Sequence, residues 1–125
     1  MKLSDWKVIV VEDEIDSMEL VKGVLDYHGI ASIGATTGEE ALKLFQEVKP
    51  TLIIIDLALP GIDGWSVLRS LKKHPTLSRV PRVAITAYHT AKVASKAIEE
   101  GFDAYFAKPL DATSFVRELQ GIVDG

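Results

Sequence analysis

The chain has 125 residues, of which 47% are hydrophobic and 26% charged, and this balance predicts one soluble globular domain over residues 1–125. Its net charge of −4 argues against nucleic acid as a direct partner, and the lack of cysteine excludes disulfides, thiolate metal sites and cysteine catalysis. No targeting peptide or membrane-spanning apolar run is found, so we expect a cytoplasmic protein that does not act on a membrane.

The first elements follow from the periodicity of the apolar residues. A β-branched run at 7–11 predicts a strand. The apolar spacing from Ile15 onward predicts a helix, with Asp13 as its N-cap and Gly29 as its stop. A weaker apolar run predicts a second strand at 30–35.

The middle of the chain contains its clearest strand. A capping box at 37–40 predicts a helix that Pro50 ends. The unbroken Leu/Ile run at 52–55 is typical of a strand that is buried on both faces of a parallel sheet. Asp56 ends this run abruptly, and a third helix is predicted after Gly64.

The last third repeats the same alternation. A short apolar run at 82–86 predicts a strand, and the alanine-rich segment at 90–100 predicts a helix that stops at the following glycine. A fifth strand is predicted at 103–107. Asp111 is predicted to cap the last helix.

Strand and helix therefore alternate five times. This pattern predicts an α/β fold in which a doubly wound, five-stranded parallel sheet carries helices on both faces. In such a sheet all the strands end at one edge, which is where ligands bind.

Polar or charged residues follow four of the predicted strands at this edge. They are Glu12, Asp13, Asp56, Thr86 and Lys108. If the strands at 7–11 and 52–55 are neighbours, their ends lie about 5 Å apart. Three carboxylates so close repel one another, and at least one carboxyl pKa should rise unless a cation intervenes.

This set of groups suits phosphoryl chemistry. Carboxylate oxygens without imidazole or thiolate are suited to Mg²⁺. The Thr86 hydroxyl provides a hydrogen-bond donor, and the Lys108 ammonium provides a positive charge for a phosphoryl group. Asp56, at the centre, is the natural nucleophile for a covalent acyl phosphate.

At this point the sequence resembles the response-regulator receiver family over almost its whole length. The matching motifs are Glu12-Asp13, Asp56 with Pro60-Gly61 downstream, Thr86-Ala87 and Lys108-Pro109. The resemblance implies a flavodoxin-like (βα)5 fold with strand order 2-1-3-4-5. It also implies a cis peptide bond between Lys108 and Pro109.

The resemblance further implies a site and partners. Asp56 would accept a phosphoryl group from a sensor histidine kinase or a histidine phosphotransfer protein. Mg²⁺ would be bound by Glu12, Asp13, Asp56 and the backbone carbonyl of Ala58. Thr86 and Tyr105 would form a switch that signals to a downstream effector protein through the face formed by the last two helices and the strand between them. Such a protein is not a turnover enzyme.

Other functions fit the residues less well. A flavodoxin-like cofactor-binding domain needs a phosphate-cradling loop after its first strand, whereas this chain has Glu12-Asp13-Glu14 there. A phosphatase of the haloacid dehalogenase type needs a second Asp at the position of Ala58. A docking domain that has lost its chemistry would not need the complete set of acids, Thr and Lys. The three histidines are expected to be surface or capping residues.

Overall fold

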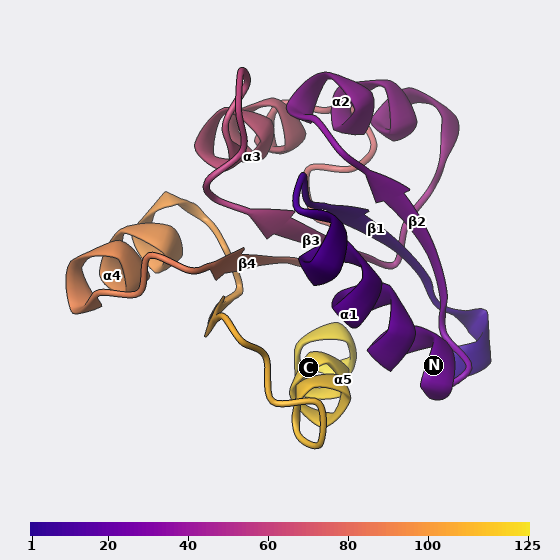
Figure 1. Cartoon of the computed structure of the whole chain (residues 1–125). Helices are drawn as coiled ribbons and strands as arrows, with labels where there is room; N and C mark the ends of the chain where they lie inside the picture. Colours follow the sequence, from indigo (N-terminus) through magenta and orange to yellow (C-terminus); the bar gives the residue numbers. More distant parts are fainter.

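The computed structural model describes all residues, 1–125 (Figure 1). A 3₁₀ helix, η1 (Leu3–Asp5), precedes five strands that alternate with five helices. The strands and helices are β1 (Lys7–Val11), α1 (Ile15–Tyr27), β2 (Ala31–Ala35), α2 (Gly38–Glu47), β3 (Leu52–Asp56), α3 (Gly64–Lys72), β4 (Arg82–Thr86), α4 (Ala91–Glu100), β5 (Ala104–Ala107) and α5 (Phe115–Asp124). None of these helices has both the length and the apolar character that crossing a membrane requires.

The five strands form one parallel sheet in the order β2-β1-β3-β4-β5, which confirms the predicted fold and strand order. The order reverses between β1 and β3, so the chain winds in one direction from β1 to β2 and in the other from β3 to β5. This reversal point places Val11, near the end of β1, directly beside Ile55 of β3. The residues that follow these two strands are therefore neighbours.

Alternate residues of the central strands enter two separate hydrophobic cores. In β3, Ile53 and Ile55 pack in the core beneath α2 and α3, and Leu52 and Ile54 pack in the core beneath α1 and α5. Figure 1 shows these two helix pairs on opposite faces of the sheet. Because each strand residue belongs to one face, a continuous apolar run serves both cores.

Helix α4 is seated more shallowly than the other helices. Its only buried residue is Ala97, whereas α1 buries three residues and α3 buries four. Side chains of α3 and α4 provide additional contacts between these helices. Lys72 Nζ donates to the carbonyl oxygen of Glu100 at 2.7 Å, and Lys96 Nζ lies 4.7 Å from the centre of the Trp65 ring.

The predicted element ends are partly confirmed. Thr37 Oγ1 accepts a hydrogen bond from the backbone N–H of Glu40, and Gly29 follows α1 with φ +74°. Two predicted N-caps are wrong. Glu14 takes the N-cap position of α1 in place of Asp13 and makes no side-chain cap bond. Asp111 does not cap α5, because its carboxylate accepts from the N–H of Thr113 and closes a separate turn before the helix.

A close backbone approach fixes the start of α3 against the end of β3. A Cβ atom at Gly64 would lie 2.4 Å from the carbonyl oxygen of Asp56 and 2.7 Å from the Cα atom of Leu57. Both atoms belong to the backbone and have little freedom to move aside. Only glycine fits between the helix and the strand end that carries Asp56.

We therefore predict that Gly64→Ala destabilises the protein by about 1–3 kcal/mol through overpacking. Gly23→Ala in α1 is the matched control, because a Cβ there meets no atom within 4 Å. Removing this helical glycine should stabilise the protein by about 0.5–1 kcal/mol. Urea unfolding of both variants measures the two effects, and equal stabilities would contradict the packing described here.

Candidate functional site

Backbone hydrogen bonds extend the sheet one residue beyond three of its strands. The N–H of Glu12 donates to Ala35 O at 2.9 Å, and the N–H of Leu57 donates to Ile85 O at 3.0 Å. The N–H of Lys108 donates to Thr86 O at 2.9 Å. The side chains at the strand ends therefore start from fixed backbone positions.

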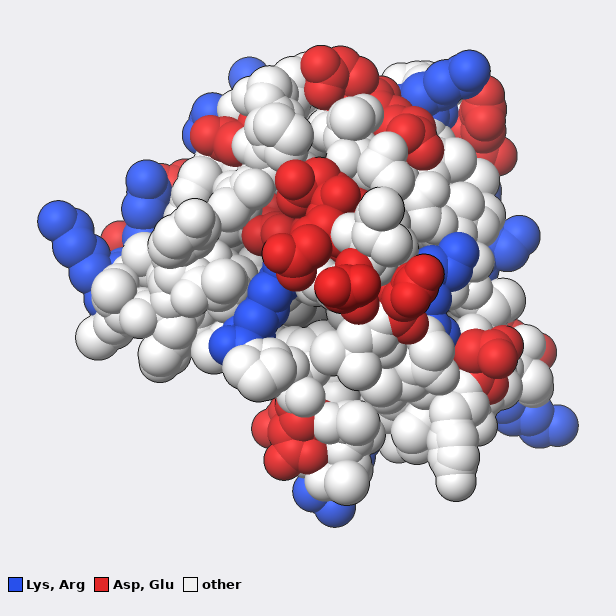
Figure 2. Space-filling model, in the orientation of Figure 1, with Lys and Arg blue, Asp and Glu red and all other residues white.

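Three acidic residues meet at this edge of the sheet. Glu12, Asp13 and Asp56 each offer a carboxylate oxygen, and these oxygens all lie within 4.8 Å of one another. Glu12 is fully buried and Asp56 is 3% exposed, whereas Asp13 is open to solvent. Figure 2 shows acidic side chains gathered at the centre of the face that this edge presents. The predicted clustering of these acids is present in the structure.

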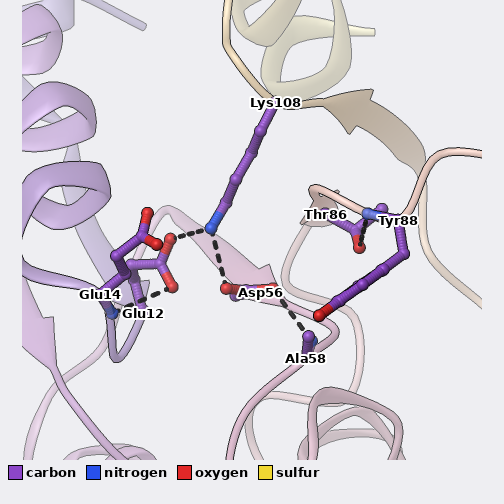
Figure 3. A network of polar contacts seen from close by, with 7 residues as sticks. All are labelled: Glu12, Glu14, Asp56, Ala58, Thr86, Tyr88 and Lys108. Atoms are coloured by element: carbon purple, nitrogen blue, oxygen red, sulfur yellow. Dashed lines mark hydrogen bonds and ion pairs between the residues drawn. The ribbon is translucent and has the colours of Figure 1, made fainter.

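Lys108 joins the two buried acids. Its Nζ forms ion pairs with Glu12 Oε1 and with Asp56 Oδ2, the latter at 3.0 Å (Figure 3). The other carboxylate oxygen of Asp56, Oδ1, accepts the N–H of Ala58 at 2.9 Å. Both oxygens of Asp56 are thus held. The peptide bond from Lys108 to Pro109 is cis, as the family resemblance implies.

The three buried groups shift one another's pKa values. Burial raises the pKa of Glu12 to about 7, and the nearby Asp56 acts in the same direction while Lys108 opposes it. Burial acts to raise the pKa of Asp56 as well, but hydrogen bonds involving Glu12, Ala58 and Lys108 outweigh it and lower that pKa below its usual value. Burial acts to lower the pKa of Lys108, but the two carboxylates raise it.

These opposite shifts separate the roles of the two buried acids. Asp56 keeps its charge at neutral pH and can act as a nucleophile. Glu12, with its pKa near neutrality, is only partly charged while no cation other than Lys108 is close. The rise in one carboxyl pKa that the sequence predicts is therefore found at Glu12.

The donor set fits a hard divalent cation. It consists of carboxylate oxygens, with no imidazole or thiolate among them, which is the chemistry that Mg²⁺ prefers. Ala58 adjoins this cluster through its N–H, which donates to Asp56 Oδ1, and its carbonyl accepts no hydrogen bond within the chain. Exposed Asp13 leaves one side of the cluster open to water, and Mg²⁺ usually retains several water ligands.

Thr86 and Tyr105 are not bonded to the acidic cluster. Thr86 is buried at the end of β4, and its hydroxyl accepts the N–H of Tyr88 at 3.0 Å (Figure 3). Tyr105 is half-buried in β5, and its hydroxyl forms a hydrogen bond with His89 Nδ1 at 2.7 Å. Thr86 thus lies at the same sheet edge as Asp56, but its hydroxyl is hydrogen-bonded to Tyr88 in the loop that follows β4.

The contact of His89 is the one feature of this region that the sequence interpretation missed. His28 and His74 bond backbone atoms near helix ends, as expected. His89 is exposed, as expected, and in addition stacks on the ring of Tyr105, with the ring centres 5.4 Å apart. The two residues are 16 positions apart, so no local spacing pattern indicates the pair.

Comparison with known proteins agrees with this architecture. The family described as the response regulator receiver domain matches residues 8–120. The polar-differentiation response regulator DivK of Brucella anthropi is 31% identical over 113 residues, which cover 90% of this chain and 92% of that protein.

Solved structures have the same fold. A structure from Chloroflexus aurantiacus, described as a response regulator, is 28% identical, superposes with a TM-score of 0.91 and covers 96% of this chain and 98% of its own. The receiver domain of a sensor histidine kinase from Pseudomonas aeruginosa, at 24% identity, has a TM-score of 0.88 with the same coverage. Since the family match covers β2 to β5, all but the first residue of β1 and the residues of the acidic site, the chain belongs to the response-regulator receiver domains of two-component systems.

Proposed function

We propose that this receiver is a phospho-accepting switch and that Asp56 carries the phosphoryl group. The observation that supports this most strongly is the ion-paired arrangement of Asp56, Glu12 and Lys108 at the carboxyl edge of the sheet. The charged, oriented carboxylate of Asp56 is suited to nucleophilic attack.

The chemical step uses groups that are already in place. A carboxylate oxygen of Asp56 attacks the phosphorus of a phosphohistidine, the O–P bond forms, and the N–P bond breaks with its electron pair returning to the histidine nitrogen. Lys108 Nζ, now bonded to Asp56 Oδ2, neutralises charge on the transferred group. Asp56 itself becomes the acyl phosphate, so the protein is the phosphoryl acceptor in this step rather than a turnover enzyme.

Mg²⁺ is the cofactor that the site fits. Glu12, Asp13, Asp56 and the carbonyl of Ala58 would hold it. Bound there, it would neutralise the negative charge that builds up on the phosphoryl oxygens during transfer. In the receiver domain from P. aeruginosa, a magnesium ion is coordinated in the active-site cleft.

The phosphoryl donor would be a sensor histidine kinase or a histidine phosphotransfer protein, and the output would pass to an effector protein. The acidic face around the site disfavours direct binding of nucleic acid (Figure 2). The same acids disfavour the alternative function of a flavodoxin-like cofactor binder, because the loop after β1 would repel the phosphate of a nucleotide.

The output would depend on Thr86, at the end of β4, and on Tyr105, within β5. Thr86 would turn its hydroxyl toward a phosphoryl group on Asp56, and Tyr105 would then move inward. The movement would change the face formed by α4, β5 and α5. A local charge change would in this way bias a two-state element.

The acceptor is tested first. Acetyl phosphate with Mg²⁺ should add one phosphoryl group to the wild type, and hydroxylamine should remove it because acyl phosphates react with this nucleophile. Asp56→Asn should abolish labelling, whereas Asp26→Asn, at an exposed position of α1, should leave it unchanged. Intact-protein mass spectrometry measures the added mass, and full labelling of Asp56→Asn would refute the assignment.

Mg²⁺ should raise the melting temperature, because a ligand of the folded state stabilises by mass action, about 2.7 kcal/mol at a hundredfold excess over Kd. Asp13→Asn should reduce this rise, since it removes a charged ligand without disturbing a buried group. Glu19→Gln, on the exposed surface of α1, is the control. Thermal melts in EDTA and in millimolar Mg²⁺ measure the effect, and an equal rise in Asp13→Asn would exclude that ligand.

The raised pKa of Glu12 predicts a pH dependence without metal. The folded protein holds the Glu12 proton up to about pH 7, whereas the unfolded chain releases it near pH 4.5. The contribution of Glu12 to the free energy of unfolding is therefore fully present below pH 4.5 and is lost as the pH rises through 7. The total loss is ~3 kcal/mol at most. Urea unfolding in EDTA from pH 5.5 to 8 measures it. Glu12→Gln should flatten the profile, and an unchanged profile would show that Glu12 is not the source of the dependence.

A further inference from the structure

A hydrogen bond and a ring stack hold Tyr105 at the outer edge of the sheet. Its hydroxyl lies 2.7 Å from His89 Nδ1, and the two rings stack with an angle of 29° between their planes. The Tyr105 hydroxyl, whose pKa burial raises above its usual value, is protonated at neutral pH like that of any tyrosine and can donate to the imidazole. His89 itself is exposed and has no other side-chain partner in the structure.

The segment that carries His89 is tied to its surroundings at each end. The hydroxyl of Thr86 accepts the N–H of Tyr88 at 3.0 Å at the start of the segment (Figure 3). Thr90 caps α4 at the other end, where its hydroxyl accepts the N–H of Val93 at 3.1 Å. The residues from Ala87 to Thr90 are all exposed, so these bonds rather than packing set the path of the loop.

We propose that His89 is a positioning residue that holds Tyr105 outward and thereby opposes the switched conformation. This inference rests on the proposed function, in which Tyr105 moves when Asp56 is phosphorylated. Because Tyr105 cannot turn inward without breaking its bond to His89, the bond stabilises the arrangement seen here over the switched one. Any ligand that favours the switched arrangement must overcome this difference in free energy between the two arrangements. Removing the imidazole of His89 should therefore make such a ligand bind more tightly.

The bond between His89 and Tyr105 also links the two switch residues, Thr86 and Tyr105, through the loop that follows β4. Thr86 engages Tyr88, and the next residue, His89, engages Tyr105. A rearrangement of the Thr86 hydroxyl therefore reaches Tyr105 through the loop between β4 and α4. His89 thus sets how strongly the protein resists activation, without touching the acidic site.

Beryllium fluoride with Mg²⁺, a tetrahedral mimic of an aspartyl phosphate, tests this proposal on the whole chain. One net hydrogen bond corresponds to about a two- to tenfold change in affinity, so His89→Phe should bind beryllium fluoride that much more tightly than the wild type. Phenylalanine keeps an aromatic ring that can stack on Tyr105 and removes both imidazole nitrogens, and with them the hydrogen bond. In a Tyr105→Phe background, the same substitution should change the affinity by less than about twofold, because the coupled partner is gone.

The matched control is His28→Phe. His28 is also an exposed histidine beside a tyrosine ring, with ring centres 5.4 Å apart, but it lies at the end of α1. Its substitution should leave the affinity unchanged. The imidazole ¹⁵N shifts of His89 provide a direct readout, because they should change in Tyr105→Phe and on addition of beryllium fluoride to the wild type.

The outcomes separate this inference from the proposed function. If the Tyr105 ring resonances of the wild type do not respond to saturating beryllium fluoride, the proposed switch is wrong and the role of His89 is wrong with it. If Tyr105 responds but His89→Phe binds like the wild type, only the role of His89 is overturned. Tighter binding in His28→Phe as large as that in His89→Phe would likewise overturn it.

Discussion

The carboxyl edge of the sheet depends on one interaction, the ion pairing of the Lys108 ammonium group with Glu12 and Asp56. The reversal of strand order between β1 and β3 forces the buried carboxylates of Glu12 and Asp56 together. Two buried like charges whose oxygens lie within 4.8 Å of each other are strongly unfavourable unless a cation compensates them. Lys108 enters from the end of β5 and bonds both carboxylates, so the ends of three strands are joined by one side chain.

In the proposed function, the same arrangement would account for the binding of a divalent cation and the transfer of a phosphoryl group. Lys108 compensates at most one negative charge, and the cluster contains three acids. Burial raises the pKa of Glu12, Asp56 adds to the rise, and the opposing effect of Lys108 does not cancel them. A divalent cation would complete the charge compensation, and a phosphoryl group would then give Lys108 a new anionic partner. Affinity for the cation and reactivity of the acceptor would thus share one physical origin.

The sequence predicts the sheet and the meeting of the acids well because both depend on regular periodicity. The apolar run before Asp56 matches a strand buried on both faces, and alternation with helices determines that its end lies beside the end of β1. The resemblance to receivers then assigns the remaining positions. Once the fold is known, it places Glu12, Asp56 and Lys108 at the same edge of the sheet, where their side chains meet.

The features that could not be predicted are those in which local bonds compete. Asp13 and Asp111 both have the side chain of a good N-cap, but Asp111 closes a turn with Thr113, and Asp13 stands one position too early in the chain. The pairing of His89 with Tyr105 depends on the path of an exposed loop, which has no periodicity to reveal it. Burial and hydrogen-bond partners decide these cases, and they are known only from coordinates.

The shallow seating of α4 gives the molecule an uneven mechanical stiffness. The backbone of Asp56 is clamped by the start of α3, where no atom larger than hydrogen fits at Gly64. On the other side of the site, α4 rests on one buried alanine and is approached through an exposed loop. Since α4 buries one residue where α3 buries four, we expect a strain that arises at Asp56 in the proposed function to displace α4 more readily than α3.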